Sequence, residues 1–170
     1  MTTPTKPNKA TDALLGLATG DALGVPYEFK SRSDMAANPA TGMIGYGTHV
    51  QSPGTWSDDS SLTFCLADSL QNGYDLRDMA DQFVRWLRAA HWTARGQVFD
   101  IGNTTHVAIR NLEELLKEIG DEPLKELTAI ENEYENGNGS LMRILPLLFY
   151  IKEMPIAEQF ARIREVSALT

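Results

Sequence analysis

Apolar residues recur at helical spacing along much of this chain, and this pattern constrains the fold most strongly. A helix over residues 76–92 would carry five apolar side chains on one face, those of Met79, Phe83, Trp86, Leu87 and Ala90. A clean alternation of apolar and polar residues, which half-buried strands require, is not found in the sequence. We therefore predict an all-α fold with few or no strands.

The same spacing, together with the positions of glycine and proline, predicts the other helices. Their expected bounds are 10–23, 60–70, 103–119, 141–152 and 156–169, and the acidic stretch 122–135 is a further candidate. Pro146 should kink its helix or mark a start, because proline lacks an N–H group and its ring clashes in a helix interior. Residues 31–53 have no clear period and predict a long loop, a kind of segment that is often functional.

Glycine recurs every four residues in the first predicted helix, at Gly16, Gly20 and Gly24. Each glycine in a helix interior costs about 1 kcal/mol relative to alanine, so three on one face need a reason. We expect another backbone or a ligand to approach this face closely.

Length and composition indicate a single folded domain. The chain has 170 residues and 42% hydrophobic content, which suffice for one sizeable core. Residues 1–9 are rich in proline, threonine and lysine and predict a flexible tail, which leaves 10–170 as the domain. The last predicted helix reaches the final residues without a glycine or polar tail, so we expect the domain to be truncated.

The formal net charge of −8 argues against nucleic acid or an anionic membrane as the main partner, since both are negative. No apolar run approaches the roughly 20 residues that a membrane span needs, and the first ten residues do not resemble a signal peptide. The single cysteine, Cys65, lies in an apolar run. We expect it to be buried and reduced, and the protein to be cytoplasmic.

Ser57, Asp58 and Asp59 stand together just before an apolar helical segment. Adjacent carboxylates repel each other unless a positive charge lies near them, and Mg²⁺ prefers carboxylate and hydroxyl oxygens. Serine and acidic residues are equally favoured at a helix N-terminus, where they cap the helix and interact with its dipole. Residues 54–61 alone leave both interpretations open, a helix cap and a metal site.

Three further polar clusters lie at predicted helix ends, in residues 20–28, 99–105 and 136–143. Helix N-termini present free N–H groups that bind phosphate, and glycines let the backbone approach a ligand closely. Each cluster taken alone is better explained as an ordinary cap or turn. All four clusters together, in an acidic all-α chain, favour a ligand site.

The four clusters resemble the ADP-ribosylglycohydrolase family, and most closely its dinitrogenase reductase-activating branch. The matching stretches, in the family's order, are GLATGDALGVPYEF, GTWSDDSSLTFCLADSL, FDIGNTT and NGNGSLMRILPL. The resemblance implies a helical hydrolase with two divalent cations, Mg²⁺ or Mn²⁺. Such an enzyme cleaves ADP-ribose from a modified protein side chain or a small acceptor.

The resemblance also implies roles for individual residues. Glu28 and Asp100 correspond to acids at the catalytic site, and the metal ligands fall on Ser57, Asp58 and Asp59. Six residues are implied to contact ADP-ribose: Gly102, Asn103, Gly137, Asn138, Gly139 and Ser140.

The family's catalytic domain is considerably longer than this chain, and its second metal-ligand motif lies in the half that is missing here. A hard cation needs about six oxygens, so the three candidate ligands alone should bind metal weakly. We therefore expect that a second chain supplies the remainder, or that the chain is a non-catalytic ADP-ribose-binding or partner-dependent half-domain. The acceptor, the metal and the oligomeric state stay open.

A zinc enzyme is not expected. The three histidines, His49, His91 and His106, are spread along the chain without the i, i+4 spacing or the cysteine cluster of common zinc sites. We interpret His91 as a residue at a helix end that either packs against its neighbours or interacts with the C-terminal helix dipole.

Overall fold

The structure is a computed structural model that describes residues 8–125, 127 and 137–170. All regular elements within these ranges are helices, which confirms the predicted all-α class for the described residues. They are α1 (Lys9–Gly24), the 3₁₀ turn η1 (Val25–Tyr27), α2 (Arg32–Ala37), α3 (Asp58–Gln71), α4 (Leu76–Ala89), α5 (Asn103–Ile119), α6 (Gly139–Arg143), α7 (Leu145–Ile151) and α8 (Ile156–Ser167).

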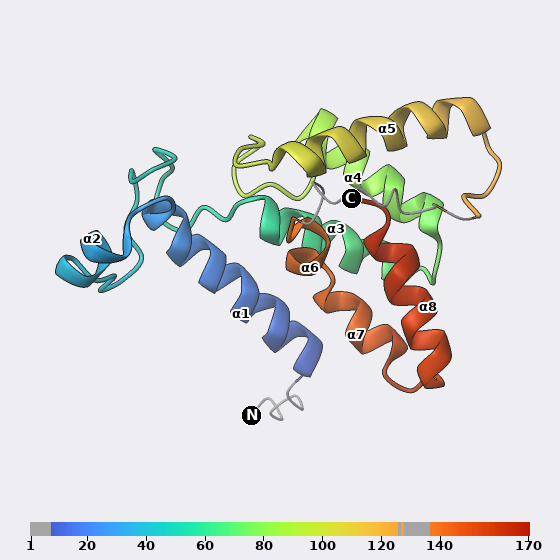
Figure 1. Ribbon diagram of the computed structural model, residues 1–170, viewed down its shortest axis with the longest axis horizontal. Coiled ribbons are helices and arrows are strands. Elements are labelled where there is room, and N and C mark those ends of the chain that lie inside the picture. Colours follow the sequence, from blue (N-terminus) through green and yellow to red (C-terminus); the bar gives the residue numbers. More distant parts are fainter. Residues whose placement is uncertain (1–7, 126, 128–136) are drawn as a thin grey trace, which may run out of the picture.

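Helix α3 lies at the centre of the molecule and packs against α1, α4, α6 and α7, while α5 covers α4 from the other side (Figure 1). The core consists of the apolar faces that helical spacing predicts. Its fully buried large apolar side chains include Leu62, Leu66, Phe83, Trp86, Ile109, Leu147 and Val166. Cys65 is also buried there, and burial raises the pKa of its thiol to about 12, so the prediction of a structural cysteine is confirmed.

Helix α5 has the predicted bounds. Pro146 was expected to kink its helix or to mark a helix start, and the structure shows the second, because Pro146 lies in the first turn of α7. Helix α1 begins one residue earlier than predicted, where the Asn8 side chain accepts a hydrogen bond from the N–H of Ala10. Residues 1–7 of the predicted tail, and residues 126 and 128–136 of the candidate acidic helix, lie outside the described residues.

Helix α3 begins two residues before its predicted start, and α8 ends two residues before its predicted end. Two further predictions are wrong. Helix α4 ends at Ala89 instead of Trp92, because Ala90 adopts a left-handed backbone conformation (φ 53°) that turns the chain out of the helix. The predicted loop 31–53 contains the short helix α2, whose N-cap Ser31 accepts a hydrogen bond from the N–H of Asp34 at 3.1 Å. A Ser-x-x-Asp pattern is a sequence signal for such a cap.

Within the described residues, no other backbone approaches the glycines of α1 closely. A Cβ atom built on Gly16, Gly20 or Gly24 would meet no heavy atom within 4 Å. The glycine face of α1 is therefore open in this structure.

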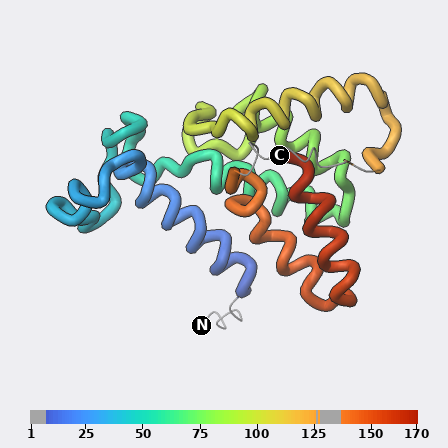
Figure 2. Tube along the Cα trace, viewed as in Figure 1, coloured from blue at the N-terminus to red at the C-terminus, as the bar shows by residue number. Residues whose placement is uncertain are grey.

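Between η1 and α3 the chain makes an excursion to one side of the helical body before it returns to the centre (Figure 2). This excursion and the segment between α4 and α5 carry several of the polar residues singled out from the sequence. None of the described helices is long and apolar enough to cross a membrane.

Candidate functional site

The site begins where the last turn of α1 meets the N-terminus of α3. The carboxylate of Asp21 accepts the N–H of Ser57 at 3.1 and 3.0 Å, the N–H of Ser60 at 3.1 Å and the hydroxyl of Ser60 at 2.5 Å. A carboxylate is stabilised there because the first N–H groups of a helix have no partner within the helix. Asp21 thus fixes the segment that carries Asp58 and Asp59 against α1.

Ser57 is the N-cap of α3, and its hydroxyl accepts a hydrogen bond from the N–H of Asp59 at 3.4 Å. Asp58 is buried, and burial, together with repulsion from Asp59 and Asp100, raises its pKa to about 8. Burial and repulsion from Asp21 also raise the pKa of Asp59. Ser57 therefore caps the helix, as the capping interpretation states. Capping does not account for the repulsion between the carboxylates beside Ser57.

The oxygen atoms at this helix end are suitable ligands for a hard divalent cation. They are one hydroxyl and two carboxylates, the oxygen ligands that Mg²⁺ and Mn²⁺ prefer. The pKa values of Asp58 and Asp59 are raised first by burial and then by repulsion from neighbouring carboxylates, and a bound cation would offset that repulsion. The assignment of Ser57, Asp58 and Asp59 as metal ligands stays a prediction.

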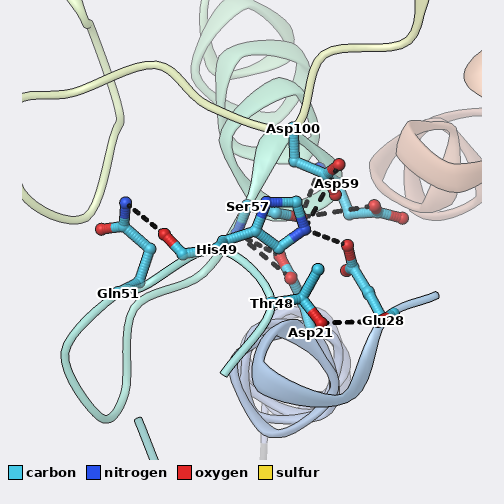
Figure 3. A network of polar contacts seen from close by, with 8 residues as sticks. All are labelled: Asp21, Glu28, Thr48, His49, Gln51, Ser57, Asp59 and Asp100. Atoms are coloured by element: carbon cyan, nitrogen blue, oxygen red, sulfur yellow. Dashed lines mark hydrogen bonds and ion pairs between the residues drawn. The ribbon is translucent and has the colours of Figure 1, made fainter. Parts of the chain in front are cut away.

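A second group of polar side chains comes from three loops that are distant in sequence. The Nε2 atom of His49 lies 2.6 Å from a carboxylate oxygen of Glu28 and 3.5 Å from one of Asp100 (Figure 3). Burial, followed by hydrogen bonding to Asp100, raises the pKa of Glu28 to about 7, although His49 acts in the opposite direction. A carboxyl group with a pKa near neutrality is suited to general acid–base catalysis.

Glu28, His49 and Asp100 each offer a ligand atom within 4.8 Å of the others, and among the described residues they form a group that could hold a metal ion. Sequence reasoning assigned the two acids to the site but not His49, which is 21 residues from Glu28 and belongs to no local motif. Asp21 lies in the first polar cluster, residues 20–28, but no local pattern marks it as the residue that fixes α3.

A cavity of about 370 Å³ brings together most of the predicted site residues. Nine of them line it: Glu28, Asp58, Asp59, Asp100, Gly102, Asn103, Gly137, Asn138 and Gly139. Two do not line it. Ser57 is covered by its neighbours, and Ser140 lines an adjoining cavity of about 510 Å³ that shares Asn103 and Gly137 with the first.

Two backbone segments line the same cavity as the acids. Gly102 is the N-cap of α5, so the free N–H groups of this helix begin at the cavity, where an anionic group can be bound. The first residue of α6 lies directly on this helix end, because a Cβ atom on Gly139 would be 2.5 Å from the hydroxyl of Thr105. Glycine at this position permits the contact.

Comparison with known proteins gives a consistent result over nearly the whole chain. The family model described as ADP-ribosylglycohydrolase matches residues 2–170. The chain is 34% identical over 148 residues to a protein of Pseudomonas putida named ADP-ribosylarginine hydrolase Tri1, and this match covers 84% of the chain and 36% of that protein. It is 32% identical over 152 residues to the ADP-ribosyl-[dinitrogen reductase] glycohydrolase of Rhodospirillum rubrum. This match covers 86% of the chain and 46% of that protein.

A solved structure described as an ADP-ribosylglycohydrolase-related protein complex matches with a TM-score of 0.63 and 31% identity, over 95% of this chain and 48% of that one. The chain therefore spans less than half the length of these relatives. The prediction that it is shorter than the family's domain is confirmed.

Proposed function

Because the chain belongs to the ADP-ribosylglycohydrolase family, we propose that the protein hydrolyses the glycosidic bond between ADP-ribose and a modified side chain or small acceptor. One observation carries this proposal: four acids and two glycine-containing loops, from segments far apart in sequence, line a single cavity. Carboxylates supply the acid–base groups that glycoside hydrolysis needs, and exposed backbone N–H groups suit a diphosphate.

ADP-ribosylated arginine is the substrate class that we propose to test first. The relative from Pseudomonas putida, and another from Serratia proteamaculans that is 41% identical over 112 residues, are both named ADP-ribosylarginine hydrolase Tri1. The second match covers 65% of this chain and 29% of that protein.

The acids divide into two groups with different environments. Glu28 and Asp100 lie at the cavity beside His49, and we propose that they assist proton transfer, because the pKa of Glu28 is raised to about 7. Ser57, Asp58 and Asp59 would hold Mg²⁺ or Mn²⁺ at the start of α3. The complete site would hold two such ions, with further ligands from outside this chain.

A divalent cation bound there would stabilise developing negative charge and orient the ribose hydroxyls. The chain's own contribution is to keep the ligands in place. Asp21 fixes the first turn of α3 through four hydrogen bonds, and Ser57 caps that turn.

The second candidate function is a half-domain that binds ADP-ribose, or a partner chain, without catalysis on its own. The open glycine face of α1 favours this second function. Large exposed apolar side chains on α6 and α8 favour it too. Leu141 is 73% exposed, Ile156 67% and Phe160 62%, an arrangement that suits burial against another polypeptide.

Two measurements on the purified chain test these alternatives. Calorimetric titration with ADP-ribose, in Mn²⁺ and then with a chelator, should show binding that depends on the metal. Incubation with ADP-ribosylarginine and Mn²⁺ should release ADP-ribose. Binding without release would favour the half-domain, and the absence of both would contradict a site within this chain.

We further propose a cytoplasmic location, supported by the single cysteine and its burial.

A further inference from the structure

The short loop of residues 46–51 is fixed against the segment that carries Glu28. The N–H of Thr48 donates to the carbonyl of Pro26 at 3.3 Å, and the Thr48 hydroxyl donates to the carbonyl of Glu28 at 2.6 Å. A Cβ atom on Gly47 would overlap the carbonyl of Pro26, so this close approach requires glycine. The loop therefore has a defined position relative to Glu28.

His49 extends from this loop to two of the four acids that line the cavity, Glu28 and Asp100. Its side chain is 15% exposed, and its Nε2 atom lies 2.6 Å from Glu28 and 3.5 Å from Asp100. Its ring contacts Phe29 and Phe99, with centroids 5.9 and 5.4 Å away. Phe29 directly follows Glu28 and Phe99 directly precedes Asp100, so the imidazole is held by the two acid-bearing segments themselves.

The backbone around His49 is held in unfavourable conformations. Phe29, Tyr46, Val50 and Asp100 all have positive φ angles, between 55° and 60°. Residues with a side chain rarely adopt this region, and a β-branched residue such as valine does so least readily. Such conformations persist only where the surrounding contacts determine them, and they concentrate at functional sites. All four lie in the three segments that meet at His49.

We propose that His49 is a positioning residue for the hydrolysis described above: its Nε2–H group donates to Glu28 and fixes that carboxyl group beside Asp100 at the cavity. This inference rests on the proposed function, because it assumes that Glu28 acts in proton transfer. A glutamate has three rotatable bonds, and a misplacement of about 1 Å can cost about 100-fold in rate.

Two variants separate the hydrogen bond from the shape of the ring. His49→Phe keeps a planar ring between Phe29 and Phe99 but removes the donor, whereas His49→Gln keeps an N–H donor at a similar reach. With ADP-ribosylarginine and Mn²⁺, we expect His49→Phe to lower kcat about 100-fold with little change in KM, and His49→Gln to recover activity to within about 10-fold of the unmodified protein.

His91→Phe is the matched control, because His91 also lies 3.7 Å from a carboxylate, that of Asp68, and contacts an aromatic ring, that of Trp92. It should leave kcat unchanged. Equal kcat for His49→Phe and the unmodified protein would overturn the inference, as would a glutamine variant as slow as the phenylalanine variant. Thermal unfolding of each variant checks that the fold is intact.

A spectroscopic measurement decides the inference even if no hydrolysis is found. In the ¹⁵N-histidine-labelled chain, long-range ¹H–¹⁵N spectra should show His49 with its proton on Nε2, and Glu28→Ala should shift that nitrogen's signal. An Nε2 atom without a proton would overturn the positioning role. The predicted signal together with no hydrolysis in the unmodified protein would instead contradict the proposed function alone.

Discussion

The helical core and the loop layer of this protein are stabilised in different ways. The core is built on α3, α4 and α5, and the loop layer comprises residues 25–56 and 90–102. Among the described residues, no buried member of the main hydrophobic cluster comes from the loop layer. Conversely, the loop layer contains all six described non-glycine residues with positive φ: Phe29, Tyr46, Val50, Ala90, Trp92 and Asp100.

This difference teaches that stability and the geometry around Glu28 and Asp100 depend on separate parts of the sequence. The core gains free energy from apolar burial, whereas the loop layer uses hydrogen bonds such as those from Thr48 and His49 to hold conformations that are costly in themselves. A substitution in the core should therefore unfold the protein, and one in the loop layer should alter binding or catalysis in a folded protein.

The largest effect is expected in the core. Leu66→Ala removes a fully buried side chain of α3 and should lower the free energy of unfolding by about 3 kcal/mol, as measured by urea denaturation. Leu141→Ala is the control, since Leu141 is 73% exposed and its loss should change stability by less than about 0.5 kcal/mol. Similar losses for both variants would contradict the assignment of the core.

Asp59→Ala should give the next largest effect, on activity and not on folding. If Asp59 binds a catalytic cation, its loss should lower the rate of ADP-ribose release at least about 100-fold. The free energy of unfolding without metal should stay equal or rise, because repulsion with Asp21 is relieved. Unchanged turnover would show that the metal assignment is wrong.

Asp58 should make the stability of the metal-free protein depend on pH. Its pKa is about 8 in the folded state, above the ordinary value of 3.8, so the folded state retains a proton that the unfolded state has released between these values. The free energy of unfolding should therefore fall as the pH rises from about 4 to 8. Asp58→Asn should reduce this fall by about 1–2 kcal/mol in chelator-treated samples. An unchanged pH profile would contradict the burial of a titrating Asp58.

Thr48→Val should have the smallest effect. It removes the hydroxyl that donates to the carbonyl of Glu28 while keeping the shape of the side chain, and one such bond contributes about 1 kcal/mol. We expect a few-fold lower rate of ADP-ribose release and a Tm within a few degrees of the unmodified protein. Thr104→Val is the control. It removes a hydroxyl at an exposed position on α5 that also lines the cavity but is not bonded to Glu28.

The parts of the fold that follow from periodicity were predictable. Helix α5 has the expected bounds, and the buried face of α4 contains Met79, Phe83 and Trp86 as expected. The end of α4 was not predictable, because Ala90 carries no glycine-like signal and its left-handed conformation depends on its surroundings. Local pattern determines helix existence more strongly than helix ends.

The site residues also divide into those that local sequence patterns predict and those that depend on the fold. The acids Glu28, Asp58, Asp59 and Asp100 could be selected because they lie in short motifs with a family resemblance, and all four line the cavity. Asp21 and His49 act through contacts 36 and 21 residues away along the chain. No local pattern encodes such contacts, so the residues that position the acids could be found only from the fold.

The hydrogen bonds of Asp21 have a consequence for how the chain folds. They bring the carboxylate of Asp21 toward that of Asp59, so the docking of α1 onto α3 concentrates like charges at one place. Added salt screens repulsion between partly exposed charges, and a divalent ion would neutralise it. Refolding of the chain should therefore become faster as ionic strength rises, and faster still in Mn²⁺, whereas a step that forms an ordinary ion pair would become slower.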